Sequence, residues 1–307
     1  MKLPILFAVL LASFFIALGS GTDWLNPLAP SGDMETSIVW QLRWPRVLTA
    51  FFVGGLLALA GAWFQVLLGN ALAEPYVLGV SGSAATGAIL ALLLPASALS
   101  IPMGAFCGAW LGIALVLLFA RLGPSRLLLA GVVMAAFWGA FVSLLLALLP
   151  GRKLGAAFAW MMGDLSSQAI HPAILMLIWG IALICGFLLS RELDALLLGD
   201  RHALALGIRV PRIRWVLLFL ASMVTAVAVT AAGTIGFVGL VIPHAMRLIF
   251  GPSHRLLLPA SAMGGGVLLM LADAASRSVI APAELPVGVL TAMIGVPVFL
   301  WLLLRRT

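Results

Sequence analysis

RELDALLLGDRHALALGIRVPRIRW, residues 191–215, is the long charged segment of a chain that otherwise consists almost wholly of apolar runs. It must lie in water, because ionised side chains are costly to place in lipid. Between residues 203 and 208, apolar side chains recur at spacings that predict a short helix with one apolar face. Gly207 is expected to end this helix, and Pro211 to separate it from the next one. The segment therefore predicts a polar loop whose helix offers an apolar surface to a soluble partner.

The composition of the remaining chain excludes a water-soluble globule. Hydrophobic residues make up 64% of the 307 residues and charged residues 9%, and the mean hydropathy is +1.21. A helix needs ~20 apolar residues to cross the ~30 Å hydrocarbon layer, so the length allows about ten spans and no separate soluble domain. Because lipid offers the backbone no hydrogen-bond partners, the spans must be helical. We expect an all-α, polytopic membrane protein with a single transmembrane domain over residues 1–307.

Ten apolar runs are long enough to be candidate spans. They cover residues 3–21, 47–68, 76–94, 103–120, 127–149, 172–190, 213–232, 235–250, 256–276 and 287–304. The first run resembles a signal peptide, but an uncleaved span is preferred because it gives an even number of crossings. An even number places both termini on the same side of the membrane.

The basic residues indicate which side that is. The formal charge of +7 would suggest nucleic acid as a partner in a soluble chain, whereas in a membrane protein Lys and Arg collect in cytoplasmic loops. The ten-span topology puts twelve of the 17 basic residues on the inner side: Lys2, Arg121, Arg126, Arg191, Arg201, Arg209, Arg212, Arg214, Arg247, Arg255, Arg305 and Arg306. Both termini are therefore expected in the cytoplasm, with membrane lipid around the helices and no nucleic acid bound.

Three of the five outer basic residues are informative exceptions. Arg43 and Arg46 flank Trp44 and Pro45 at the outer mouth of the second span, where the positive-inside rule disfavours them. An acidic partner could meet them, or they could reach lipid phosphates or neutralise acidic residues between positions 33 and 35. Arg277 has Asp273 four residues earlier on the same helix, which favours a local salt bridge.

Several kinds of chemistry have no motif in the sequence. The chain has two lysines and no phosphate-binding Gly-rich loop, so ATP hydrolysis would require another chain. Cys107 and Cys185 stand alone in apolar runs and are expected to be buried small hydrophobes, not a disulfide or metal pair. The four histidines lack metal-ligand spacing and are expected to be interfacial or capping residues, so we expect no metal or cofactor. Few ionisable residues lie within the spans, which argues against an ion-driven carrier.

One short motif leaves an enzyme as a remote alternative. Gly79-Val80-Ser81-Gly82 matches the Gly-x-Ser-Gly pattern of rhomboid-type intramembrane serine proteases. Close packing of helices explains the same small residues without catalysis.

Longer runs carry a more specific resemblance. They include RWPRVLTAFFVGGLLALAGAWFQVLLGNALAEPYVLGVSGSAATGA (43–88), SRLLLAGV (125–132), GTIGFVGLVIPHAMRLIFGPSHRLLLPASAMGGG (233–266), LADAASR (271–277) and AELPVGVLTAMIGVPVFLWLLL (283–304). These runs resemble permease subunits of type II ABC importers, a family that takes up cobalamin, ferric siderophores and haem. The likeness extends over nearly the whole chain with its motifs in order.

The resemblance implies a partner and a role for each candidate site. It implies a homodimer in the bacterial inner membrane, with two cytoplasmic ABC ATPases below and a periplasmic substrate-binding protein above. The pathway would run between the two permease copies, without a catalytic residue on this chain. The residues implied to couple to the ATPase are Asp200, Arg201, Ala203, Leu206 and Gly207. Those implied to dock the binding protein are Arg43, Arg46 and Arg277. The cytoplasmic gate is implied at Asn70, Ala71 and Leu72, where the family's turn reads Asn-Pro-Leu.

The substrate follows less directly from the resemblance. Within the family the chain is most similar to the cobalamin permease, through NALAEPYVLGVS (70–81), AWMMGDL (159–165) and the ending at 283–304. Siderophore and haem permeases share several of these runs. Cobalamin is therefore the expected substrate, with a ferric siderophore or haem as the alternative.

Overall fold

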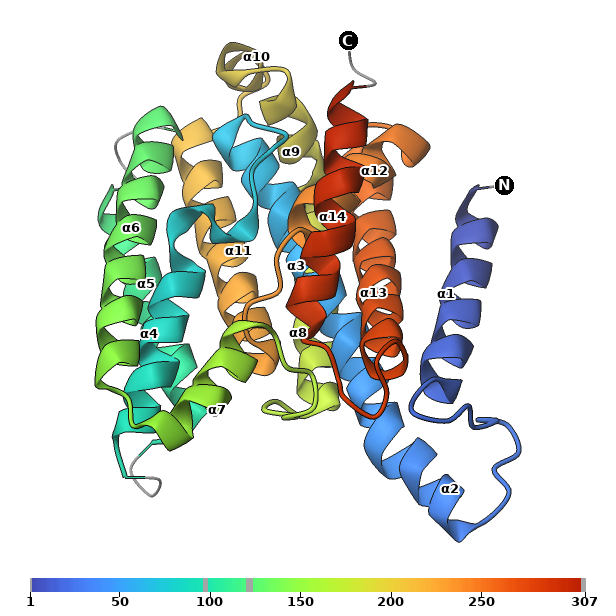
Figure 1. Ribbon diagram of the computed structural model, residues 1–307. Coiled ribbons are helices and arrows are strands. Elements are labelled where there is room, and N and C mark those ends of the chain that lie inside the picture. Colours follow the sequence, from blue (N-terminus) through green and yellow to red (C-terminus); the bar gives the residue numbers. More distant parts are fainter. Residues whose placement is uncertain (1, 96–98, 120–123, 305–307) are drawn as a thin grey trace.

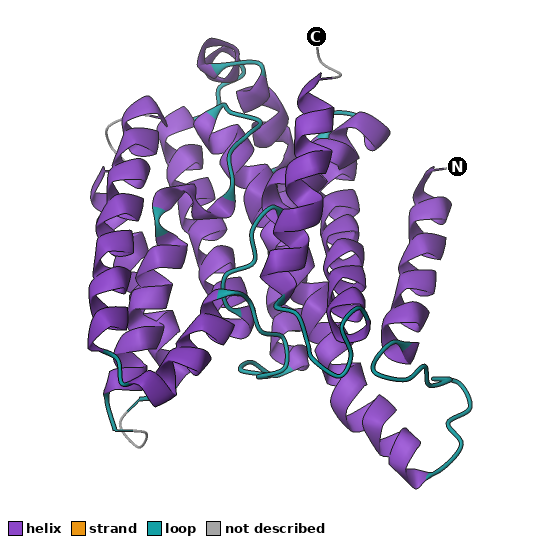
Figure 2. Ribbon diagram, viewed as in Figure 1, coloured by secondary structure: helices purple, strands orange, loops and turns teal. Residues whose placement is uncertain are grey.

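The computed structural model describes residues 2–95, 99–119 and 124–304, and this part of the chain is helical without strands (Figures 1 and 2). The expected all-α fold is confirmed. The helices are α1 (Lys2–Gly19), α2 (Asp33–Ser37), η1 (Ile38–Arg43), α3 (Trp44–Leu68), η2 (Pro75–Leu78), α4 (Val80–Leu93), α5 (Ile101–Phe119), α6 (Pro124–Leu148), α7 (Gly151–Met161), α8 (Pro172–Leu188), α9 (Ser190–Leu197), α10 (Asp200–Ala205), α11 (Val210–Ala232), α12 (Val238–Phe250), α13 (His254–Ser278) and α14 (Val287–Leu304).

Among the described residues, six helices are long and apolar enough to cross a membrane. A seventh candidate is the pair α8 and α9, which bends by 58° at its break. Three shorter apolar helices lie at 80–93, 238–250 and 287–301. The structure thus supports a multi-span bundle, while the count of ten stays a prediction.

Three helix boundaries differ from the sequence prediction. The second span was expected from residue 47, but α2, η1 and α3 form one helical stretch from Asp33 to Leu68, because no glycine or proline interrupts positions 33–44. The run at 76–94 is divided where Gly79 takes a left-handed φ of 76° between η2 and α4. The outer segment at 150–171 contains the amphipathic helix α7.

Helix α3 forms the centre of the bundle and is buried along most of its length against α8, α11, α12 and α13. Glycines allow the closest of these contacts. A Cβ atom added to Gly54 would lie 2.2 Å from the Gly265 carbonyl oxygen, and one added to Gly61 would lie 1.8 Å from that of Gly239. Gly87 and Gly104 bring α4 and α5 together in the same way. Small residues at these crossings let the helix backbones touch, which is the main source of packing energy between helices in lipid.

The two ends of the bundle carry different elements. The start of α1, the end of α14 and the short helix α10 lie at one end, whereas α7 and the turn between α1 and α2 lie at the other (Figure 1). This arrangement agrees with both termini and the 191–215 segment being on one side of the membrane. Arg305, Arg306 and parts of the predicted turns at 95–102 and 121–126 lie outside the described residues.

The prediction for one cysteine was wrong. Cys107 is exposed on the outer surface of α5, and Cys185 is half-buried, so only the expectation that the two do not form a disulfide is confirmed. An apolar run predicts a span but not which side of it faces the bundle. Cys107 lies on a side of α5 that this chain does not cover.

Candidate functional site

The predicted partner-binding helix is α10, and glycine turns set both of its ends. Gly199 before it has φ 102° and Gly207 after it has φ 78°, conformations that other residues adopt only with strain. The Gly207 N–H donates to the Leu204 carbonyl (2.9 Å), which closes the helix as the sequence predicted. The chain bends by 58° between α8 and α9, and α9 still packs on the bundle through Leu193 and Leu196, while α10 follows at the end of the bundle (Figure 1).

The apolar residues of α10, and Leu206 directly after it, are divided between two surfaces. Ala203 is fully buried, whereas Leu204 is 58% and Leu206 68% exposed. Asp200 and Arg201 are also exposed. Ala203 therefore anchors the helix to its own chain, and contact with a partner would involve the leucines and the charged residues instead.

One ion pair and one Asp–His hydrogen bond hold this segment against the membrane helices. Asp200 accepts from Arg214 of α11 (2.8 Å). On α9, Asp194 lies 2.6 Å from the Nδ1 of His254 and accepts the His254 backbone N–H (2.9 Å) at the start of α13. Asp194 thus caps α13 and joins it to α9. Sequence reasoning missed this contact, because a capping carboxylate is normally sought next to the helix in sequence, not 60 residues away.

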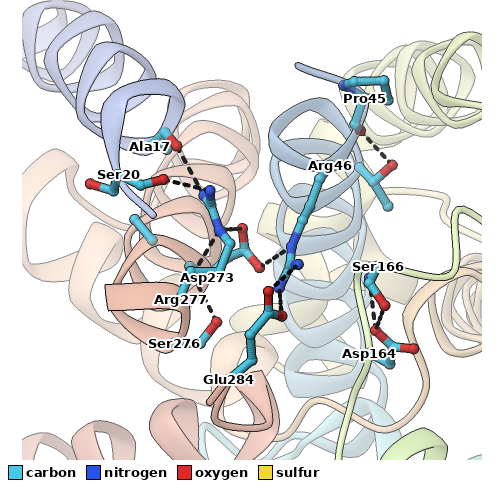
Figure 3. A network of polar contacts seen from close by, with 12 residues as sticks. Ala17, Ser20, Pro45, Arg46, Asp164, Ser166, Asp273, Ser276, Arg277 and Glu284 are labelled. Atoms are coloured by element: carbon cyan, nitrogen blue, oxygen red, sulfur yellow. Dashed lines mark hydrogen bonds and ion pairs between the residues drawn. The ribbon is translucent and has the colours of Figure 1, made fainter. Parts of the chain in front are cut away.

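A network of charges occupies the opposite end of the bundle (Figure 3). The fully buried Asp273 accepts from Arg46 Nε (2.8 Å) and from Arg277 Nε (3.1 Å), so the predicted local pair of Arg277 and Asp273 is confirmed. Arg46 also pairs with the half-exposed Glu284 (2.9 Å). The acidic partners of Arg46 are therefore Asp273 and Glu284, not the residues at 33–35 considered from the sequence. Asp273 has a charged group on either side of it, which offsets the cost of its burial.

Arg43 and Arg277 both bind the end of α1. Arg43 donates to the carbonyls of Leu18 (3.1 Å), Gly19 (2.6 Å) and Asp23 (3.1 Å). Arg277 donates to the carbonyls of Ala17 (2.9 Å) and Ser20 (2.7 Å). The last carbonyls of a helix have no partner within it, and cationic side chains at that end satisfy them and favour the helix dipole. Both arginines are buried, so the structure assigns them an anchoring role inside this chain.

A cavity of about 450 Å³ opens beside this network. Arg43, Arg46 and Arg277 all line it, together with Glu284 and the segment from Gly21 to Asp23. The structure therefore brings together all three outer arginines that the sequence singled out.

The predicted gate forms a compact turn after α3. Gly69 ends α3 with φ 60°, and the Asn70 side chain then accepts the Leu72 N–H (2.9 Å). This side-chain turn gives local order where the family's pattern has proline. Leu72 is exposed, as a residue bordering an opening would be.

Two polar residues after this turn bind the loop between α11 and α12. Glu74 accepts the Phe237 N–H (2.6 Å) at the start of α12. The Tyr76 hydroxyl donates to the Ile235 carbonyl (3.1 Å) and accepts the Ile235 N–H (3.0 Å). These contacts fix the gate turn to α12 and were not predicted from the sequence. Burial raises the pKa of the Glu74 carboxyl, which lies in the loop between α3 and η2, and the hydrogen bond from Phe237 partly opposes this.

We predict that Glu74 makes stability depend on pH. A carboxyl group whose pKa is raised by folding stabilises the protein fully below its unfolded pKa near 4.5, and that stabilisation is lost as pH rises through the folded pKa. Glu74→Gln keeps an oxygen acceptor for Phe237 without the charge, so its melting temperature should exceed the wild type's increasingly as pH rises. Glu74→Ala removes both the acceptor and the charge, so it should cost about 1–3 kcal/mol at low pH and progressively less as pH rises. Melting curves of the three proteins across this range check both effects. A constant difference between Glu74→Gln and wild type would contradict the role of the charge.

Comparison with known proteins identifies the chain. Residues 4–305 match the FecCD transport family. The chain belongs to the FecCD transport family. It is 40% identical to the vitamin B12 import system permease protein BtuC of Vibrio cholerae over 93% of this chain and 88% of that protein. It is also 40% identical to the Fe(3+) dicitrate transport system permease protein FecD of Escherichia coli, over 92% of this chain and 89% of that protein.

A solved structure supports the same assignment. A chain described as an inward-facing metal-chelate type ABC transporter superposes with a TM-score of 0.87 at 32% identity, covering 98% of this chain and 97% of that one. The FecCD chain is thus a permease subunit of a type II ABC importer and a multi-pass protein of the bacterial inner membrane. Permease subunits of this family are not enzymes, and the ATPase activity lies in a partner subunit. The serine-protease alternative at Ser81 is therefore discarded.

Proposed function

We propose that this FecCD permease forms the translocation pathway for cobalamin. The observation that supports this most directly is the similarity to vitamin B12 permeases from several organisms, at 38–40% identity over most of the chain. The FecD relative has the same level of identity, which makes a ferric siderophore the second candidate. Both solutes are bulky and require a wide opening, which one bundle with a closely packed centre does not provide. A pathway between two copies of the chain meets that requirement, so we propose a homodimer.

The α10 surface is the proposed contact with the ABC ATPase. Its exposed residues are Asp200, Arg201 and Leu204 on α10 and Leu206 directly after it. The link from Asp200 to α11 and the link from Asp194 of the preceding α9 to α13 would pass a movement of the ATPase into the bundle. At the opposite end, the cavity beside Arg46 is the proposed contact with the substrate-binding protein. The turn at Asn70, Ala71 and Leu72 is the proposed inner gate.

Uptake by the reconstituted importer tests the substrate. The permease is placed in liposomes with the ATPase and binding protein from the same genome, and ATP-dependent accumulation of cobalamin, a ferric siderophore and haem is compared. We expect cobalamin to accumulate faster than the other two. Accumulation of ferric siderophore without cobalamin would establish the second candidate instead.

A further inference from the structure

The two carboxylates that bind Arg46 differ in how freely they can leave it. Asp273 is fully buried and bound to two arginines, whereas Glu284 is 51% exposed and binds Arg46 alone. The Glu284 oxygens accept from two nitrogens of one guanidinium, at 2.9 Å and 3.3 Å. Ion pairs with both partners in water contribute only ~0.2–1 kcal/mol. Glu284 is in contact with water and Asp273 stays on the 12% exposed Arg46 when Glu284 leaves, so this pair opens at a cost close to that range.

The other two arginines cannot exchange partners in the same way. Arg43 binds three backbone carbonyls, and Arg277 binds two carbonyls and the buried Asp273. Releasing either would leave the end of α1 without partners for its carbonyls. Of the three outer arginines, Arg46 is therefore the one that can accept a new carboxylate.

The cavity has the charge to attract such a carboxylate. Three guanidinium groups line it, against the carboxylates of Asp23 and Glu284 in its lining and of Asp273 bound beneath Arg46 and Arg277. When the Glu284 side chain turns away, one positive charge is left without a carboxylate. The backbone around Glu284 is held independently of its side chain, because the Leu285 N–H donates to the Ser276 carbonyl (3.0 Å). The Glu284 side chain can therefore swing away without the loop unfolding.

We propose that Glu284 occupies, in the free permease, the position that a carboxylate of the substrate-binding protein takes on docking. Docking is then an exchange of one carboxylate for another on Arg46, with Arg43 and Arg277 as positioning residues. This proposal rests on the proposed function, because only an importer permease has a substrate-binding protein as its docking partner. The internal pair weakens docking of the binding protein and keeps the partly exposed Arg46 neutralised between docking events.

Replacing Glu284 tests the exchange. Glu284→Gln removes the competing charge and keeps the side-chain volume, so the binding protein should dock about two- to fivefold more tightly, the range that corresponds to an exposed ion pair. Arg46→Gln should weaken docking. In the Arg46→Gln background, Glu284→Gln should give no gain, because the competition acts through Arg46. Glu35→Gln is the matched control, since this exposed outer carboxylate binds the Ser31 N–H and lies outside the cavity.

Docking is measured with the assembled permease and ATPase in lipid nanodiscs and the purified binding protein from the same genome, at low and high ionic strength. If the binding protein does not bind the wild-type complex, the proposed docking partner is wrong. If it binds the wild type but Glu284→Gln docks no more tightly, the exchange is wrong while the proposed function stands. An equal gain in the Arg46→Gln background, or from Glu35→Gln, would also overturn the exchange, because it would indicate a general charge effect.

Discussion

Asp273→Asn should destabilise the bundle by about 3–5 kcal/mol, the cost of removing one partner from a buried ion pair. The substitution keeps the volume of the side chain but removes the charge that Arg46 and Arg277 share at 2.8 Å and 3.1 Å. The buried Arg277 guanidinium would then have no carboxylate partner, and the partly exposed Arg46 would keep only Glu284. Chemical unfolding in detergent, or the melting temperature, measures the loss.

Glu284→Gln is the control for this prediction, because it removes a half-exposed carboxylate instead of a buried one. It removes a charge from the same Arg46, but at a half-exposed position, so the expected loss of stability is below ~1 kcal/mol. If the two variants were equally stable, the buried position of Asp273 would not be the source of its contribution. A large loss for both would instead indicate that the whole outer network unfolds as a unit.

Leu206→Asp should weaken binding of the ATPase by more than about tenfold and abolish uptake at unchanged permease levels. Leu206, the residue directly after α10, is 68% exposed, and burying a leucine against a partner contributes ~1.5–3 kcal/mol. The aspartate also adds a charge that the interface would have to desolvate. Because the side chain contacts solvent in this chain, folding of the permease should be unaffected. Co-purification of the ATPase and transport assays measure the two effects.

Leu28→Asp is the matched control for that experiment. Leu28 is 82% exposed in the turn between α1 and α2, at the opposite end of the bundle from α10. It receives the same change, and ATPase binding should remain at the wild-type level. Normal co-purification of Leu206→Asp would show that α10 is not the ATPase contact.

The sequence predicted contacts within one helix and failed for contacts between distant segments. Arg277 and Asp273 are four residues apart on α13, so the helical repeat alone brings them together. Glu284 is 238 residues from Arg46, and Glu74 is 163 residues from Phe237. These pairs depend on how α3, α12 and α13 pack, which the apolar composition of the runs does not specify.

Helix positions were likewise predicted where local sequence determines them and missed where it does not. Apolar composition predicted most of these positions, because spans must satisfy their own backbone hydrogen bonds. It missed the continuation of α3 back through η1 and α2 to Asp33, because charged and apolar residues alternate there without a long apolar run, while no glycine or proline interrupts the helix before Trp44. It also missed that Ala203 is buried within its own chain, because the sequence of a short helix does not specify which of its apolar residues face solvent.

The glycine contact between α3 and α13 has a consequence for transport. Gly54 and Gly265 place the two backbones so close that even a methyl group would overlap a carbonyl oxygen. Helices interlocked in this way cannot slide along each other without losing dense packing. We therefore expect α3 and α13 to move as one rigid unit during transport, with any hinge movement confined to the helices around them.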